Sequence, residues 1–252
     1  MTPSVLFITA FKDIGRGDWT LPKARTNGWY LYWFSFLAKL PANLILFCDS
    51  DIAKQIEEER GFKNSYPYEA EQTFFTRLDR QRQIMESPDF RKLVRDRDSP
   101  ECHIPEYNIA TNNKALFVQR AKNMFPDYTH YAWIDFSYFR EEQFIPNALN
   151  FDCVKSTIEF SAFEIQHDIP GPRENVSINH DPIQGGLFIC PKDMVDWYAE
   201  EYTHMVDHFE SLGVVDDDQA IVLQMYKKFP EKFTMTRKDE WFDLIKDYQV
   251  TD

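Results

Sequence analysis

Asp135 has the position that most clearly predicts chemistry, because it directly follows the apolar run Tyr131-Ala132-Trp133-Ile134. Such a run predicts a strand that is buried on both faces. In open α/β sheets, ligands bind beyond the carboxyl ends of the strands. Mg²⁺ and Mn²⁺ take one or two carboxylates together with phosphate oxygens. We therefore predict that Asp135 binds a metal ion beside a phosphate-bearing ligand, with a capping or loop acid as the structural alternative.

The segment after the first apolar run, residues 5–10, also contains groups suited to phosphate. Gly15 and Gly17 permit close approach of the backbone to a ligand, and Arg16 can pair with phosphate oxygens. Arg25, at the start of the next predicted helix, adds a second positive charge. Taken alone, the segment also fits a solvated loop, so its interpretation depends on whether the fold brings it close to Asp135.

Acidic residues follow the second apolar run, residues 43–48. Of Asp49 and Asp51, one could hydrogen-bond a ribose or base, and the other could cap the helix that follows. Capping alone is the alternative. Lys114 is a further candidate, because it could either reach a phosphate or lie on a helix surface.

A second group of acids, Asp216-Asp217-Asp218, opens a predicted helix and is followed by Gln219. Acids at a helix N-terminus are favoured by the macrodipole, which explains one or two of the three. The group could instead hold acceptor hydroxyls or act as a general base. Gln184-Gly185-Gly186 precedes a predicted strand, where paired glycines indicate either a tight turn or backbone that passes close to a ligand.

Alternating strand and helix signals predict an α/β fold with a mostly parallel central sheet flanked by helices. Residues 64–100 are charged and helical in tendency, residues 169–182 resemble a loop, and the segment from residue 234 is short and mixed. The predicted strands are residues 5–10, 43–48, 131–134, 156–165 and 185–190, and the predicted helices are residues 26–40, 52–60, 112–125, 192–212 and 216–229.

Length and composition limit the class of protein. A chain of 252 residues suits one large α/β domain or two small ones. The formal net charge of −13 disfavours nucleic acid as a partner. No apolar stretch reaches the roughly 20 residues that a membrane span requires, and the N-terminal apolar run lacks the basic flank of a signal peptide. Four widely spaced cysteines without a CxxC motif fit a reducing compartment, so we expect a cytoplasmic protein.

Five motifs together resemble the bacterial HtrL/YibB family, also called WlaTC/HtrL, over about residues 5–242. This family is associated with bacterial surface-polysaccharide gene clusters and resembles GT-A-type glycosyltransferases. The resemblance implies a single GT-A-like domain, with a nucleotide-binding half at 1–135 and an acceptor-binding half at 136–252. The motifs are Thr9-Ala10-Phe11-x-Asp13-Ile14-Gly15-Arg16-Gly17-x-Trp19, Pro105-Glu106-Tyr107-Asn108, Ala132-Trp133-Ile134-Asp135, Gly185-Gly186-Leu187-Phe188 and Asp216-Asp217-Asp218-Gln219.

GT-A enzymes bind Mn²⁺ and the donor diphosphate through an Asp-x-Asp motif, and here the matching positions are Asp135-Phe136-Ser137. Ser137 replaces the second acid, so the implied Mn²⁺ or Mg²⁺ would be held by Asp135 and, more weakly, by Ser137. Many GT-A enzymes also use a late histidine as a ligand. None follows His208 in this chain, so Asp217 or Asp218 would have to serve.

The leading hypothesis is a transferase that moves a sugar from a nucleoside diphosphate, with UDP expected, to a glycan or lipid-linked acceptor. A non-catalytic sugar-nucleotide-binding protein is the first alternative, and a metal-dependent phosphohydrolase with Asp135 as nucleophile is the second. Asp217 or Asp218 would serve the acceptor or act as the base. The residues expected to bind the donor are Thr9, Ala10, Phe11, Asp13, Arg16, Arg25, Asp49, Lys114, Asp135, Gln184, Gly185 and Gly186.

Overall fold

The computed structural model describes residues 3–20, 24–164, 168–178 and 182–250. Its centre is a seven-stranded sheet in the order β3-β2-β1-β4-β6-β5-β7. All neighbouring strands pair in parallel except at β6, which is antiparallel to both β4 and β5. The strands are β1 (Val5–Phe11), β2 (Asn43–Cys48), β3 (Ser65–Pro67), β4 (His130–Ile134), β5 (Ile158–Ala162), β6 (Ile183–Pro191) and β7 (Phe233–Arg237).

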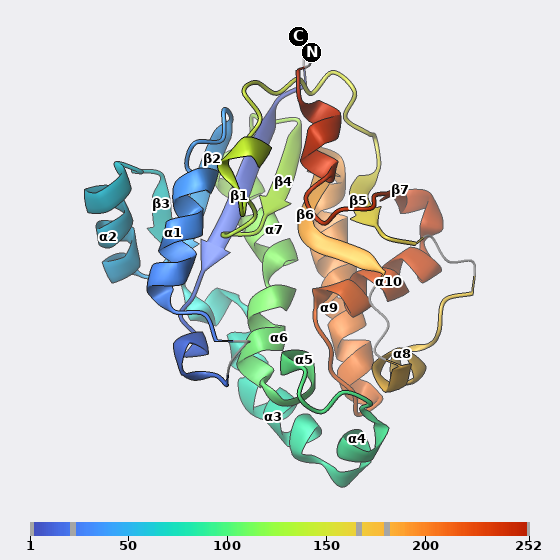
Figure 1. The fold of residues 1–252 in the computed structure, drawn as a ribbon. Helices are drawn as coiled ribbons and strands as arrows, with labels where there is room; N and C mark the ends of the chain where they lie inside the picture. Colours follow the sequence, from blue (N-terminus) through green and yellow to red (C-terminus); the bar gives the residue numbers. More distant parts are fainter. Residues whose placement is uncertain (1–2, 21–23, 165–167, 179–181, 251–252) are drawn as a thin grey trace.

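Helices cover both faces of the sheet, as Figure 1 shows. Alternate side chains of β1 point to opposite faces. Leu6 and Ile8 join a core that includes residues of α7, α9 and α10, whereas Val5 and Phe7 join a core with α1 and α2. The helices are α1 (Asn27–Leu37), α2 (Ser50–Arg60), α3 (Leu78–Glu86), α4 (Pro88–Leu93), α5 (Pro100–His103), α6 (Pro105–Asn112), α7 (Lys114–Met124), α8 (Pro172–Ile178), α9 (Val195–Ser211) and α10 (Asp218–Lys228).

This architecture confirms the predicted fold class, an α/β fold with a mostly parallel sheet flanked by helices. β4 belongs to the predicted half 1–135 and β6 to the predicted half 136–252. These two strands pair, so both halves contribute to one sheet. Local sequence signals fix two of the helix ends. Thr26 caps α1 by accepting a hydrogen bond from the backbone N–H of Trp29, and Gly61 ends α2 at a φ of 68°. Within the described ranges, no helix is long and apolar enough to span a bilayer.

The structure differs from the sequence prediction in four segments. The charged segment 64–100 contains the short strand β3, and the C-terminal segment contains β7. The predicted loop 169–182 contains α8, because Pro172 at its first position fits a helix start. The predicted helix 112–125 is interrupted at Asn113, which separates Asn112, the last residue of α6, from the whole of α7.

The predicted strand 185–190 is part of β6, which begins two residues earlier, at Ile183, so Gly185 and Gly186 lie inside the strand. Its pairing with β5 is irregular at this point. Phe160 of β5 pairs with Phe188, whereas the next residue of β5 pairs with Gln184. Gly185 and Gly186 therefore lie in a bulged part of β6, where glycines often permit close packing.

Candidate functional site

A cavity of about 340 Å³ opens beyond the carboxyl ends of β1 and β4. Eight aromatic side chains form much of its wall, and the charged side chains at its surface are mainly positive. In a chain with a net charge of −13, this local excess of positive charge indicates an anionic ligand. The charged residues that line it are Lys12, Arg16, Arg25, Lys114 and Arg140, together with Asp13 and Asp135.

The loop after β1 holds Arg16 at one side of this cavity. The Asp13 carboxylate accepts hydrogen bonds from the backbone N–H of Gly15 at 2.8 Å and from the Asn27 amide at 2.8 Å, which fixes the loop against α1. Arg16 donates to the Tyr30 hydroxyl at 3.0 Å, and its guanidinium lies 5.6 Å from the Tyr107 ring centroid. Aromatic rings hold a guanidinium in a fixed orientation, and guanidiniums bind phosphate through pairs of parallel N–H donors.

Arg25 and Arg140 both lie against Trp29, at 4.8 and 4.4 Å from its ring centroid. Burial lowers the pKa of Arg140, and the charges of Arg25 and Arg16 lower it further, while Asp135 opposes them. The Arg140 Nε is buried without a hydrogen-bond partner among the described residues. Three guanidiniums that repel one another are stabilised when an anion enters between them, so this group fits a diphosphate.

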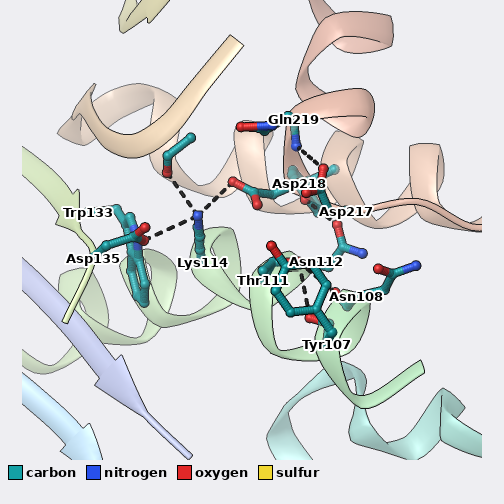
Figure 2. Close-up of polar contacts among 12 residues, drawn as sticks. Tyr107, Asn108, Thr111, Asn112, Lys114, Trp133, Asp135, Asp217, Asp218 and Gln219 are labelled. Carbon is teal, nitrogen blue, oxygen red and sulfur yellow. Dashed lines mark hydrogen bonds and ion pairs between the residues drawn. The ribbon is translucent and has the colours of Figure 1, made fainter. Parts of the chain in front are cut away.

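Asp135 and Lys114 belong to a second, more buried group of charges, shown in Figure 2. The Lys114 Nζ lies 2.8 Å from the Gly185 carbonyl oxygen, 2.8 Å from Asp218 Oδ2 and 3.2 Å from Asp135 Oδ1. These three acceptors match the three hydrogens of an ammonium group. Asp135 Oδ1 also accepts a hydrogen bond from Trp133 Nε1 at 2.8 Å. The Asp135 carboxylate is therefore held through one oxygen.

Elements far apart in sequence bring these groups together. Lys114 is the first residue of α7 and Asp218 is the first residue of α10, while Asp217 caps α10 by accepting from the Gln219 N–H at 3.0 Å. Because β6 is antiparallel, its first residues meet the carboxyl end of β4, and the Asp135 N–H donates to the Gly186 carbonyl at 2.8 Å.

Charge pairing stabilises the buried ammonium. Burial alone would lower the pKa of Lys114, but Asp135 and Asp218 together raise it above its ordinary value. Burial also raises the pKa of Asp218, and the nearby Asp135 adds to this effect, against the opposing charge of Lys114. The side chains of Lys114 and Asp218 are only 8% and 7% exposed. The charge of each one therefore offsets the cost of burying the charge of the other.

Eight of the predicted site residues line the cavity, and the others lie around it. Thr9 is fully buried in β1, and Asp49 pairs with the Lys12 ammonium at 2.8 Å beside a neighbouring cavity. Gln184 is buried and donates to the Lys238 carbonyl at 3.2 Å. The residues that line the cavity are Ala10, Phe11, Asp13, Arg16, Arg25, Lys114, Asp135 and Ser137.

Sequence reasoning missed several residues of the cavity wall. Arg140 follows Asp135 by five positions in the same loop, so its closeness in sequence to the strand end could have identified it as a candidate. Lys12 likewise directly follows β1. The aromatic residues carried no such signal, because a high aromatic content is usually explained by core packing. The aromatic wall residues missed are Trp29, Tyr30, Tyr68, Tyr107, Trp133, Phe136 and Trp241.

The side chains around Asp135 fit a resident metal ion poorly. Asp135 Oδ1 already receives two donors, and Ser137 is only 6% exposed. In the part of the chain that the structure describes, no three His, Cys, Asp or Glu side chains are grouped to hold a metal ion. The predicted ligands Asp217 and Asp218 are occupied as a helix cap and as the partner of Lys114. The residues present around Asp135 therefore do not fit a resident metal ion.

The two glycines of β6 make room for side chains of the protein. A Cβ on Gly185 would lie 2.4 Å from Asp218 Oδ2, and one on Gly186 would lie 2.7 Å from Trp241 Nε1. Gly185 thus permits the close approach of Asp218 to Lys114, and Gly186 permits Trp241 to form part of the cavity wall.

We expect Gly185→Ala to lower the free energy of unfolding by about 1–3 kcal/mol, because the added methyl group must displace the Asp218 carboxylate. Gly171→Ala is the matched control, since a Cβ there meets nothing within 4 Å. Urea denaturation followed by tryptophan fluorescence would measure both variants. Equal stability of the two variants would contradict the close packing of Gly185 against Asp218.

Comparison with known proteins identifies the family. Residues 3–250 match the family described as "Bacterial protein of unknown function (HtrL_YibB)". The chain is 29% identical to Protein HtrL of Escherichia coli (strain K12) over 268 residues, which cover 98% of this chain and 93% of that protein. It is also similar to a solved structure described as "crystal structure of a glycosyltransferase involved in the glycosylation of the major capsid of PBCV-1", with 10% identity, a TM-score of 0.40, and coverage of 93% of this chain and 82% of that one. A TM-score of this size carries no argument about function. Because the family match extends over nearly the whole sequence and agrees with its motifs, the chain belongs to the HtrL_YibB family.

Proposed function

We propose that the protein is a glycosyltransferase that moves a sugar from a nucleoside diphosphate, with UDP as the expected nucleotide, to a hydroxyl group of a glycan or lipid-linked acceptor. The observation that carries the proposal is the cluster of Arg16, Arg25 and Arg140 beside Asp135, in a cavity with aromatic walls. Guanidiniums bind a diphosphate, aromatic faces bind a base or sugar ring, and a carboxylate binds sugar hydroxyls.

The proposed reaction places these groups on either side of the bond that breaks. The acceptor hydroxyl oxygen forms a bond to the anomeric carbon, and the bond from that carbon to the diphosphate oxygen breaks. The nucleoside diphosphate leaves with the electron pair, where the guanidiniums of Arg16, Arg25 and Arg140 stabilise the developing charge. The hydroxyl proton passes to a base, and Asp135 is the carboxylate of the cavity best placed for this role or for orienting the sugar.

The burial of Asp218 favours a second candidate, a sugar-nucleotide-binding protein without turnover. Asp217 and Asp218 were the predicted catalytic acids, yet one caps α10 and the other pairs with Lys114. Hydrolysis of a UDP-sugar by the purified protein would rule against this candidate. The phosphohydrolase has the weakest support, because the sequence lacks the Asp-x-Asp-x-Thr arrangement that such enzymes often carry.

Calorimetric titration with UDP, GDP, ADP and CMP tests the proposal directly. We expect at least one nucleoside diphosphate to bind in the micromolar range and CMP to bind more weakly, because it lacks the second phosphate. A panel of UDP-sugars would then be assayed for release of UDP. If no nucleoside diphosphate bound below millimolar concentration, the proposal would be wrong.

Arg140→Met is expected to weaken nucleoside diphosphate binding by roughly 10- to 100-fold, because it removes a charge-assisted hydrogen bond while keeping most of the apolar contact with Trp29. Arg91→Met is the matched control, since Arg91 is exposed on α4 and is not part of the cavity wall. Both variants would be measured by the same calorimetric titration. Similar affinities for Arg140→Met and Arg91→Met would show that Arg140 does not contact the nucleotide.

A further inference from the structure

The position between Asp135 and Asp218 already contains a fixed cation. Two carboxylate oxygens and the Gly185 carbonyl oxygen converge on one point, and oxygens of these kinds bind Mg²⁺ or Mn²⁺ in other proteins. Here the Lys114 Nζ occupies that point, at 2.8, 2.8 and 3.2 Å from the three oxygens. An ammonium group and a divalent ion cannot share it, because like charges repel strongly in a buried site.

The arrangement around Lys114 makes its displacement costly. Lys114 is buried, and its three donors are all engaged with acceptors that are themselves held by β4, β6 and α10. An entering metal ion would have to expel the ammonium from this site and leave it without its three partners. Separating a buried charge from its partner is strongly destabilising in proteins, because it leaves the charge buried and uncompensated.

We propose that Lys114 takes the place of the divalent ion in this family member, so that the nucleotide donor binds without a resident metal. The buried Lys114 neutralises Asp135 and holds it in position. Arg16, Arg25 and Arg140 neutralise the diphosphate in the cavity. The nucleotide part of this inference rests on the proposed function. Its metal part concerns only the three oxygens and the ammonium, so it can be tested without any nucleotide.

Titration with Mn²⁺, followed by the electron paramagnetic resonance signal of the free ion, tests the metal part. The wild-type protein is expected to leave the signal of free Mn²⁺ unchanged at micromolar concentrations. Stoichiometric uptake by the wild type that is lost in Asp135→Asn would overturn the proposal.

Lys114→Ala provides the complementary test, because it removes the ammonium and leaves the three oxygens with room for an ion. We expect this variant to bind Mn²⁺ at about 1:1 stoichiometry and to gain thermal stability when Mn²⁺ is added. The double variant Lys114→Ala/Asp218→Asn is the control, since it removes one of the two carboxylate ligands and should not respond. A Lys114→Ala variant that is folded by circular dichroism yet takes up no Mn²⁺ would show that these oxygens do not form a cation position, and the assignment would fail.

Calorimetry with UDP in EDTA and in Mn²⁺ tests the nucleotide part. We expect the wild-type dissociation constants in the two buffers to agree within about threefold, a difference of less than 1 kcal/mol. Binding that requires Mn²⁺ would overturn the inference and leave the proposed function standing. Absence of binding in both buffers would instead overturn the proposed function, and the Mn²⁺ titration would still decide whether Lys114 replaces the ion.

Discussion

Replacing Lys114 with methionine is expected to lower the free energy of unfolding by about 3–5 kcal/mol, the range typical when one partner of a buried ion pair is removed. Methionine keeps most of the length and volume of the lysine stem, so the loss reports mainly on the charge. Without the ammonium, the buried Asp218 carboxylate lies near Asp135 with no cation between them. Urea denaturation followed by tryptophan fluorescence would measure the change.

Two further variants separate this effect from a general loss of packing. Lys122→Met removes a lysine on the same helix that pairs with Asp196 at the surface, and we expect a change of at most about 1 kcal/mol. Lys114→Met/Asp218→Asn removes the buried carboxylate charge together with the ammonium, so it should recover a large part of the lost stability. If Lys114→Met and Lys122→Met were equally stable, the buried charge group would not hold α7 and α10 together.

Long apolar runs made the central strands predictable from sequence. β1, β2 and β4 are buried almost throughout, so their hydrophobic residues form continuous runs. The edge strands have no such pattern. β3 is three residues long without a buried residue, and β7 has one buried residue among five. These strands exist because a neighbouring strand offers hydrogen bonds to their backbone, which is a tertiary effect that a local sequence pattern does not contain.

The same distinction applies to the site. Asp135 was predictable because it follows a buried strand, and strand ends meet at one edge of a sheet. Its partners depend on tertiary structure: 71 positions separate Lys114 from Gly185, and 104 separate it from Asp218. The antiparallel direction of β6 brings Gly185 to this edge, and a strand signal in the sequence does not contain the direction of pairing.

The geometry changes the expected role of Lys114. From sequence it was a candidate for phosphate binding, but in the structure its three hydrogens point to protein oxygens. Arg16, Arg25 and Arg140 line the same cavity and lie against aromatic rings, and we assign the binding of the diphosphate to them. Lys114 acts as a positioning residue. Both it and Asp135 line the cavity, but the Asp135 side chain is 38% exposed and that of Lys114 only 8%.

Asp135→Asn is expected to reduce the rate of UDP-sugar turnover by about 10²–10⁴-fold, the range typical for loss of a general base. Asparagine keeps the shape of the side chain and can still accept from Trp133 Nε1, so the change removes the charge and the basicity with little effect on packing. The side chain of Asp135 is 38% exposed and lines the cavity, which places it where a sugar hydroxyl or an acceptor hydroxyl can reach it. Steady-state release of UDP would measure the rate.

The control for this variant lies near the other end of the same strand. Asp127→Asn changes an exposed acid just before β4, beyond the amino end of that strand, and we expect no change in turnover. UDP affinity should change by less than about fivefold in Asp135→Asn, because the guanidiniums that bind the diphosphate remain in place. A variant with full turnover would remove Asp135 from the reaction. A variant with normal turnover at saturation and only a raised KM would show instead that Asp135 binds the sugar without serving as the base.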